Sequence, residues 1–430
     1  MSLSATAPPV SLLRRYWRDR ALWMTIADVF AILAAFTLPW STTLPAIFVP
    51  LWLGAVAWVM DWRAYGRLLK LPICYLPLAL VGLALVGTLW SDAAWSARLY
   101  AVSPTLKLLV LPGLFYHFER SSRGIWVFVA FLVSCALLMA VSWLVVMEPS
   151  LTLKAPDEAG GRGIFVKNYI DQSQEFALCA VALAYPIIRL LRTNQIWQAL
   201  VLGAISLGFV VNMAFVIVSR TAMVTIPIML AVFALLHLKW RTSLVIFGGL
   251  AVMAGLAFAT SPPLQLTTDA FVSDYLRYKN ENLPTSVGLR LEYWRKSLGF
   301  FTEAPVIGNG TGSTLDLFKR TATGAGNRAT AQVIGNPHNQ TLAVAVQWGA
   351  AGIILLYAMW LSHLRLFRGD DLASWIGLLV VVQNIFTSLF NSHIFDFHEG
   401  WMYVFGVGVA GGMTLAAGQH NARAESAGSS

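Results

Sequence analysis

Long apolar runs alternate with short polar links along most of the chain, and one long polar segment interrupts this pattern. A helix needs about 20 apolar residues to cross a bilayer. Within the bilayer every backbone polar group must be satisfied internally, which favours helices. The pattern therefore predicts an all-α polytopic membrane protein with about twelve transmembrane helices. The predicted spans are 22–40, 42–60, 71–90, 103–118, 124–147, 170–190, 196–218, 221–237, 243–260, 341–362, 372–390 and 401–418.

The same pattern divides the chain into four parts. Residues 1–260 would hold the first nine helices, and 261–341 would form one large loop that contains amphipathic helices. Residues 342–418 would hold the last three helices. The small, polar tail 419–430 is expected to be disordered and cytoplasmic.

Charge supports this arrangement and sets its direction. Only 12% of the 430 residues are charged and 57% are hydrophobic, whereas soluble proteins carry about 25% charged residues. Alternate links are basic, as the positive-inside rule expects of cytoplasmic loops. Both termini are then cytoplasmic, and 261–341 lies on the outer side of the membrane. The net charge of +9 is thus a signal of topology, and we expect no nucleic-acid partner. The basic links are 63–70, 120–123, 189–192, 239–241 and 365–368.

Cysteines and nucleotide motifs offer no sign of a cofactor. Cys74, Cys135 and Cys179 all lie inside apolar runs, so we expect neither disulfides nor a thiolate metal site. No Walker or dinucleotide motif occurs in the sequence. We expect the protein to work without a cofactor.

The loop 261–341 contains a predicted helix from about 286 to 302, with Thr285 or Ser286 as N-cap. On a helical wheel Arg290 falls within a wide apolar face, one turn before Trp294. Glu292, Arg295 and Lys296 form the polar face. An unpaired buried charge is costly, so Arg290 needs an anionic partner. A phosphate would suit its bidentate fork; the alternatives are a structural carboxylate or a side chain that snorkels to the interface.

Two further residues are candidates for chemistry on the same side of the membrane. Arg220 lies in a very short outer turn between two apolar runs, where a cation runs against the charge bias. It could instead anchor the chain to lipid phosphate. His338 stands where the polar loop re-enters the membrane, and a neutral imidazole is a natural general base. A structural role for His338 remains open. Arg98, Lys107, Arg162 and Lys167 could extend a basic funnel around these residues.

The segment 393–399 carries His393, Asp396 and His398, whose spacing could supply two imidazoles and a carboxylate to a metal. It lacks a closed ligand set, and short membrane loops are often polar because they are wet. No Asp-x-Asp pair lies on the outer side. We therefore expect no metal ion in the site.

The order of these residues resembles the O-antigen ligase and polymerase superfamily of membrane glycosyltransferases. The resemblance rests on Ser219-Arg220, Arg290-x-x-x-Trp294, Pro305-x-x-Gly308-x-Gly310 and His338-Asn339. It spans the whole topology and is specific over about 215–345. Within the superfamily the chain is most similar to the O-antigen ligases of Gram-negative inner membranes, because the external link 148–169 is short.

The resemblance implies a GT-C-like fold in the bacterial inner membrane and an inverting, metal- and ATP-independent reaction. Polysaccharide on undecaprenyl diphosphate would be transferred in the periplasmic leaflet to a sugar hydroxyl of lipid A–core, as a step of lipopolysaccharide biosynthesis. It implies that Arg220 and Arg290 bind the diphosphate and that His338 activates the acceptor. Membrane lipids would surround the site. Secondary candidates are Asn339, Trp294, Arg162 and Asp396, and the glycine-rich runs 308–312 and 324–326 suggest a mobile cover.

Three alternatives stay open from the sequence. An O-antigen polymerase would share the donor and the motifs. A flippase or transporter of lipid-linked sugars would place its arginines along a midplane cavity with broken helices. A non-catalytic membrane scaffold would not need a base on the same side as two arginines.

Overall fold

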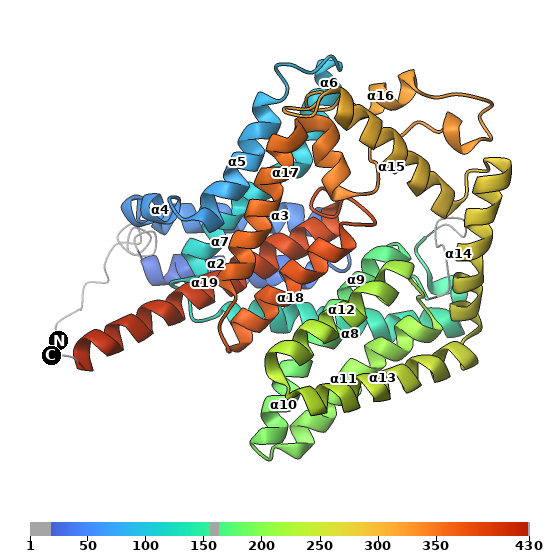
Figure 1. The fold of residues 1–430 in the computed structure, drawn as a ribbon. Helices are drawn as coiled ribbons and strands as arrows, with labels where there is room; N and C mark the ends of the chain where they lie inside the picture. Colours follow the sequence, from blue (N-terminus) through green and yellow to red (C-terminus); the bar gives the residue numbers. More distant parts are fainter. Residues whose placement is uncertain (1–18, 155–162, 429–430) are drawn as a thin grey trace, which may run out of the picture.

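The protein is described by a computed structural model that covers residues 19–154 and 163–428, and every regular element in these ranges is helical (Figure 1). Within these ranges, eight helical stretches are long and apolar enough to cross a membrane, or nine if one bent pair counts as a single span. The elements in order are α2 (Arg20–Thr37), α3 (Thr43–Val59), α4 (Trp62–Leu68), α5 (Pro72–Val86), α6 (Trp95–Val102), η1 (Ser103–Val110), α7 (Leu111–Phe118), α8 (Gly124–Met147), η2 (Pro149–Leu151), α9 (Tyr169–Ala182), α10 (Ala184–Arg192), α11 (Ile196–Phe215), α12 (Arg220–His237), α13 (Trp240–Thr260), α14 (Pro262–Glu281), α15 (Ser286–Glu303), α16 (Thr314–Arg320), η3 (Ala329–Ala331), α17 (Gln340–Leu366), α18 (Leu372–Thr387) and α19 (Phe397–Gly428).

Each of the twelve predicted spans coincides with a helix or a pair of consecutive helices. In three of them, α5, α12 and α18, the apolar helical stretch is only 10–17 residues long, and α3 meets α4 at a bend of 116°. The all-helical class is therefore confirmed, whereas the count of twelve crossings stays a prediction. The chain is a multi-pass membrane protein.

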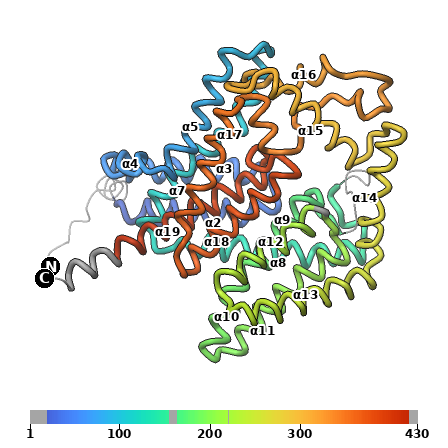
Figure 2. The backbone as a smooth tube through the Cα atoms, viewed as in Figure 1, coloured from blue at the N-terminus to red at the C-terminus, as the bar shows by residue number. Residues whose placement is uncertain are grey.

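Small residues explain how the first helices pack. Ala27, Ala31 and Ala34 are fully buried along one face of α2, and this spacing of three and four residues makes one stripe. Small side chains let helix backbones approach closely, which is how membrane helices gain contact. In Figures 1 and 2 the bundle around α2, α7, α17, α18 and α19 forms the centre of the molecule.

The large polar segment is more helical than the sequence suggests. Helix α14 begins at Pro262, directly after α13, and Ser261 caps it by accepting a hydrogen bond from the Leu264 amide at 3.3 Å. Neither α13 nor α14 has a buried residue. Together they run along the outside of the bundle and carry the chain to α15 and α16 at the top right of Figure 1.

Helix α17 is kinked at Gly349, whose φ of 59° and ψ of −152° break the helical path. The kink frees carbonyl groups of the preceding turn, and the glycine-rich run binds them. The amides of Asn309 and Gly310 donate to Val346 and Gln347 at 2.9 Å. A Cβ on Gly308 would lie 2.4 Å from the Gln347 backbone. The glycines at 308–312 therefore allow close packing against α17, and the mobility of this run stays a prediction.

The C-terminal tail also differs from the expectation. Helix α19 continues to Gly428, so the disordered tail expected from Gln419 is helical over its described part. Alanine, glutamine, arginine and glutamate are good helix formers, and they are frequent between residues 415 and 427. The helix therefore has a local reason to continue past the membrane span.

Candidate functional site

Helix α15 begins as the sequence predicts. Thr285 is its N-cap, and its side chain accepts a hydrogen bond from the Gly288 amide at 3.2 Å. Gly288 is needed beside α14, because a Cβ there would lie 2.3 Å from Tyr278. The cap and the close crossing fix the direction in which α15 presents its side chains.

The polar face that the helical wheel assigned to α15 is wrong for two of its three residues. Glu292 and Lys296 are buried, and Arg295 is exposed. Glu292 accepts hydrogen bonds from Arg295 at 2.6 Å and from the Tyr278 hydroxyl at 3.1 Å. Burial by itself would raise the pKa of Glu292, but Arg295 holds it below its usual value. Tyr278 and Arg295 thus satisfy the buried Glu292 carboxylate, which the helical wheel places in solvent.

Arg290 lines a pocket of about 380 Å³ together with residues from three distant segments. Ser219 and Thr221 lie on either side of Arg220 at the start of α12, Pro263 and Thr267 at the start of α14, and Tyr169 at the start of α9. The Ser219 hydroxyl is buried and has no hydrogen-bond partner among the described residues. The fold therefore brings Arg290 to the turn that contains Arg220, as the phosphate-binding hypothesis requires.

Two of the arginines named from the sequence lie partly or wholly outside the described residues. The backbone of Arg220 begins α12, but its side chain is not described. Arg162 falls in the segment 155–162, which is not described. Their roles stay predictions.

His338 occupies the turn directly before α17. Its φ of 51° lies in the left-handed region, where histidine is uncommon. The Asn336 side chain accepts from the His338 amide at 3.0 Å, and the ring of Tyr293 stacks on the imidazole at 6.1 Å between centroids. Since Tyr293 follows Arg290 by three residues on α15, this helix connects the pocket to His338. His338 does not line the pocket itself.

The hydrogen bonds around His338 define its tautomer. Nδ1 lies 2.8 Å from Oδ1 of Asn391, and Nδ2 of Asn391 donates to Asp396 at 2.7 Å. An ionised carboxylate only accepts, so the amide nitrogen must face Asp396 and the amide oxygen must face His338. Nδ1 then carries the proton. Nε2 keeps its lone pair, and no described residue bonds it.

Asn391 and Asn336 were missed by the sequence reasoning. Asn391 lies 53 residues from His338, and the Ser392 hydroxyl donates to Asn336 at 2.7 Å. These contacts arise because the link after α18 packs on the turn before α17. No local spacing in the sequence signals them.

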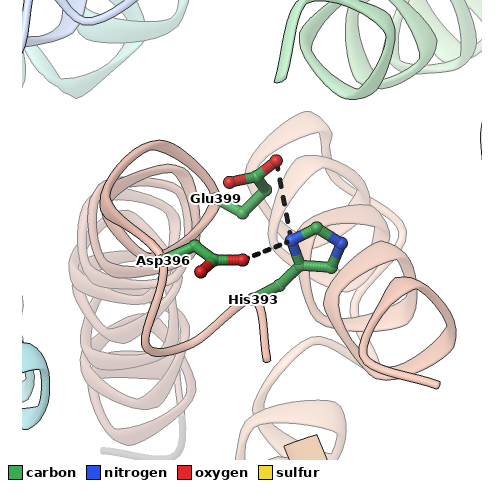
Figure 3. A group of neighbouring side chains, drawn as sticks. All are labelled: His393, Asp396 and Glu399. Carbon is green, nitrogen blue, oxygen red and sulfur yellow. Dashed lines mark ion pairs between the residues drawn. The ribbon is translucent and has the colours of Figure 1, made fainter. Parts of the chain in front are cut away.

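The three residues of 393–399 whose spacing could supply metal ligands do not all come together in the structure. His398 does not join His393 and Asp396; its Nδ1 lies 2.7 Å from Asp171 of α9. Glu399 takes its place, and both carboxylates point at Nδ1 of His393, at 3.4 and 3.5 Å (Figure 3). The three side chains lie close enough to hold a metal ion.

Protonated His393 supplies a positive charge inside this cluster. His393 is fully buried. Burial would lower its pKa, but Glu399 and Asp396 raise that pKa to about 9. At neutral pH the imidazolium itself is the cation between the two carboxylates, and a protonated imidazole does not ligate a metal. Without a metal ion the cluster is a buried ion-pair network, and a metal could bind only if His393 released this proton.

The remaining candidates have structural partners. Lys167 is buried against Glu175 at 2.8 Å, and buried Lys107 donates to the Asp396 carbonyl, so neither extends a solvated basic funnel. Asn339 caps α17 by accepting from the Leu342 amide at 3.0 Å. Trp294 packs beside Tyr293 and Phe300.

Taken together, these features define an all-helical, multi-pass membrane protein with an arginine-lined pocket and an oriented histidine beside one polar helical segment. Residues 205–357 match the family model described as O-antigen ligase, and over this range the chain carries a domain of that family. The match includes Arg220, Arg290 and His338 and confirms the resemblance seen in the sequence. The family is one of glycosyltransferase-like membrane enzymes. No curated protein matches the chain.

Proposed function

We propose that the protein is an O-antigen ligase that transfers polysaccharide from undecaprenyl diphosphate to a sugar hydroxyl of lipid A–core. The observation that carries this proposal is the pocket in which Arg290 meets the turn around Arg220. As the glycosidic bond breaks, negative charge grows on the leaving diphosphate. Fixed guanidinium groups stabilise that charge more in the transition state than in the ground state.

His338 would act on the acceptor. Nε2, with its lone pair, takes the proton of the acceptor hydroxyl while that oxygen attacks the anomeric carbon and the diphosphate lipid departs. Direct attack from the face opposite the leaving group inverts the anomeric centre. The diphosphate linkage is already activated, so the reaction needs no ATP.

Asn391 and Asp396 support the role of His338 as a base because they orient its ring. Asn391 accepts the hydrogen bond from Nδ1–H and is held in turn by Asp396, which places the lone pair of the neutral ring on Nε2. Such an orienting pair does not itself become protonated, and it acts by fixing the tautomer of the base. We infer that Asn391 and Asp396 are positioning residues.

A transfer assay in EDTA tests the proposal. Purified protein would be incubated with lipid-linked polysaccharide and lipid A–core, without ATP, and the conjugate would be detected by its shift on a gel. We expect conjugate to form and free undecaprenyl diphosphate to appear with it. Loss of activity in EDTA that one divalent ion restores would return His393, Asp396 and Glu399 to consideration as ligands.

The same assay separates the alternatives. A polymerase would lengthen the donor polysaccharide when lipid A–core is omitted. A flippase would move donor across vesicles without making any new glycosidic bond. The short external link at 148–169 favours the ligase, since polymerases of the same superfamily tend to have two long external loops.

A further inference from the structure

A second charged pocket, of about 520 Å³, lies between α10 and α12. It sits at the far end of α12 from Arg220, because α12 begins at Arg220 and ends at His237. In Figure 1 α10 lies at the bottom, and α15 and α16 lie at the top right. Its basic residues belong to a link that the positive-inside rule places in the cytoplasm.

Two guanidinium groups dominate the charge of this pocket. Arg189 and Arg192 are three residues apart, so they share a face of α10, and both are exposed. Neither forms an ion pair with a described residue. Arg189 donates to the Tyr185 hydroxyl at 3.5 Å and Arg192 to the His237 carbonyl at 3.4 Å. These long bonds to neutral oxygens leave most of the guanidinium donors for a ligand.

One acidic residue also lines the pocket. Asp370 follows α17, and its main-chain carbonyl accepts from the Tyr185 hydroxyl. Two guanidinium groups against one carboxylate leave a net positive charge. A ligand that carries one negative charge and hydroxyl donors would satisfy both kinds of group.

The wall beside these charges is apolar. Leu236 lines the pocket, and Leu235 and Leu236 are 83% and 57% exposed. Phe233 and His237 form the inner side and contact Trp375 at 4.9 and 5.2 Å between centroids. Exposed leucines at the end of a membrane helix face acyl chains, so the pocket opens toward lipid.

We propose that this pocket binds the headgroup of an anionic phospholipid of the phosphatidylglycerol type. The phosphate binds Arg189 and Arg192 through their forks, the glycerol hydroxyls donate to Asp370, and the acyl chains lie on Leu235 and Leu236. Basic pockets between membrane helices on the cytoplasmic side bind anionic headgroups in this way. The site is separate from the proposed transfer reaction and does not depend on it.

Native mass spectrometry of the purified full-length protein, titrated with phosphatidylglycerol, tests this proposal. The variant is Arg189→Gln with Arg192→Gln. The matched control is Arg365→Gln with Arg368→Gln, two exposed arginines at the same spacing that do not line the pocket. We expect the first pair to weaken the tightest lipid adduct on the order of tenfold, and the control to leave it unchanged. Arg192→Gln alone should give a smaller loss.

Two further arms identify the ligand. Phosphatidylcholine, which bears a cation and no hydroxyl donors, should bind more weakly than phosphatidylglycerol. Inorganic phosphate at equal concentration should fail to displace the lipid, and displacement would show that the phosphate group alone is recognised. Equal affinity in wild type and the Arg189/Arg192 variant would overturn the site.

Discussion

At the scale of single residues, His338 is held in place by Asn391, which lies 53 residues away in the sequence. Arg290 stands out because it interrupts an apolar face, and His338 because it borders a span. Their partners could not be found in the same way. Asn391 reaches His338 only through the packing of the link after α18, and the Tyr278 partner of Glu292 comes from α14, a helix that the sequence reasoning did not anticipate.

The orienting role of Asn391 leads to a kinetic prediction. Asn391→Leu has a similar size but removes the acceptor for Nδ1, so the proton is no longer confined to that nitrogen. We expect kcat to fall, by less than the about 10²–10⁴-fold typical of losing a general base, while the KM for the lipid donor stays unchanged. Steady-state transfer kinetics measure both. Ser392→Ala is the control, because Ser392 bonds Asn336 and not His338. An equal loss of kcat in the control would indicate a structural effect.

At the scale of elements, the start of α15 was predicted within a residue because capping is local. The packing of the glycine-rich run was not. The sequence alone allows these glycines to be hinges or sites of close contact. The kink at Gly349 decides between the two, and the backbone partner Val346 lies 37 residues after Asn309 of the run.

Gly308 offers a test of that packing. Its φ is 69° and a Cβ would meet the Gln347 backbone, so Gly308→Ala should destabilise the protein by about 1–3 kcal/mol. Thermal unfolding in detergent measures the change. Gly299→Ala is the matched control, since no atom lies within 4 Å of its added Cβ, and a helical Gly→Ala change stabilises by roughly 0.5–1 kcal/mol. Equal melting temperatures would mean that the run is not packed as described.

The loop between α18 and α19 carries a pH-dependent contribution to stability. The pKa of His393 is raised to about 9 by Glu399 and Asp396, against about 6.5 in an unfolded chain. A raised pKa means that the contribution is complete below about pH 6.5 and is lost as the pH rises through 9. Melting temperature should therefore fall between pH 6.5 and 9.5. The fall should be smaller in His393→Gln, and a parallel curve for that variant would contradict the charged imidazolium.

At the scale of the whole molecule, hydrophobic runs predicted where helices lie because the bilayer sets their length. Polarity inside the bundle was harder to foresee. The first turns of α9 bury Asp171, Gln174 and Glu175, and such groups are tolerated in a membrane when they face partners in the interior. His398 pairs with Asp171, Lys167 pairs with Glu175, and Gln383 donates to Gln174.

The predicted orientation can be checked directly. The 261–341 segment should be periplasmic and the α4 region cytoplasmic, because the link 63–70 is basic. Cysteine introduced at Thr323 should react with an impermeant maleimide on intact cells, and cysteine at Arg67 should react only after the cells are opened. Both positions are exposed. The reverse pattern would contradict the topology.

The most direct measurement of the central claim separates donor binding from transfer in three variants. Labelled undecaprenyl diphosphate binding and single-turnover transfer would be measured for Arg290→Lys, Arg220→Lys and His338→Ala. Lysine keeps the charge but loses the fork, so we expect both lysine variants to lose donor affinity and most transfer. His338→Ala should lose transfer by about 10²–10⁴-fold and still bind the donor. Intact binding and transfer in both lysine variants, together with lost donor binding in His338→Ala, would contradict the account.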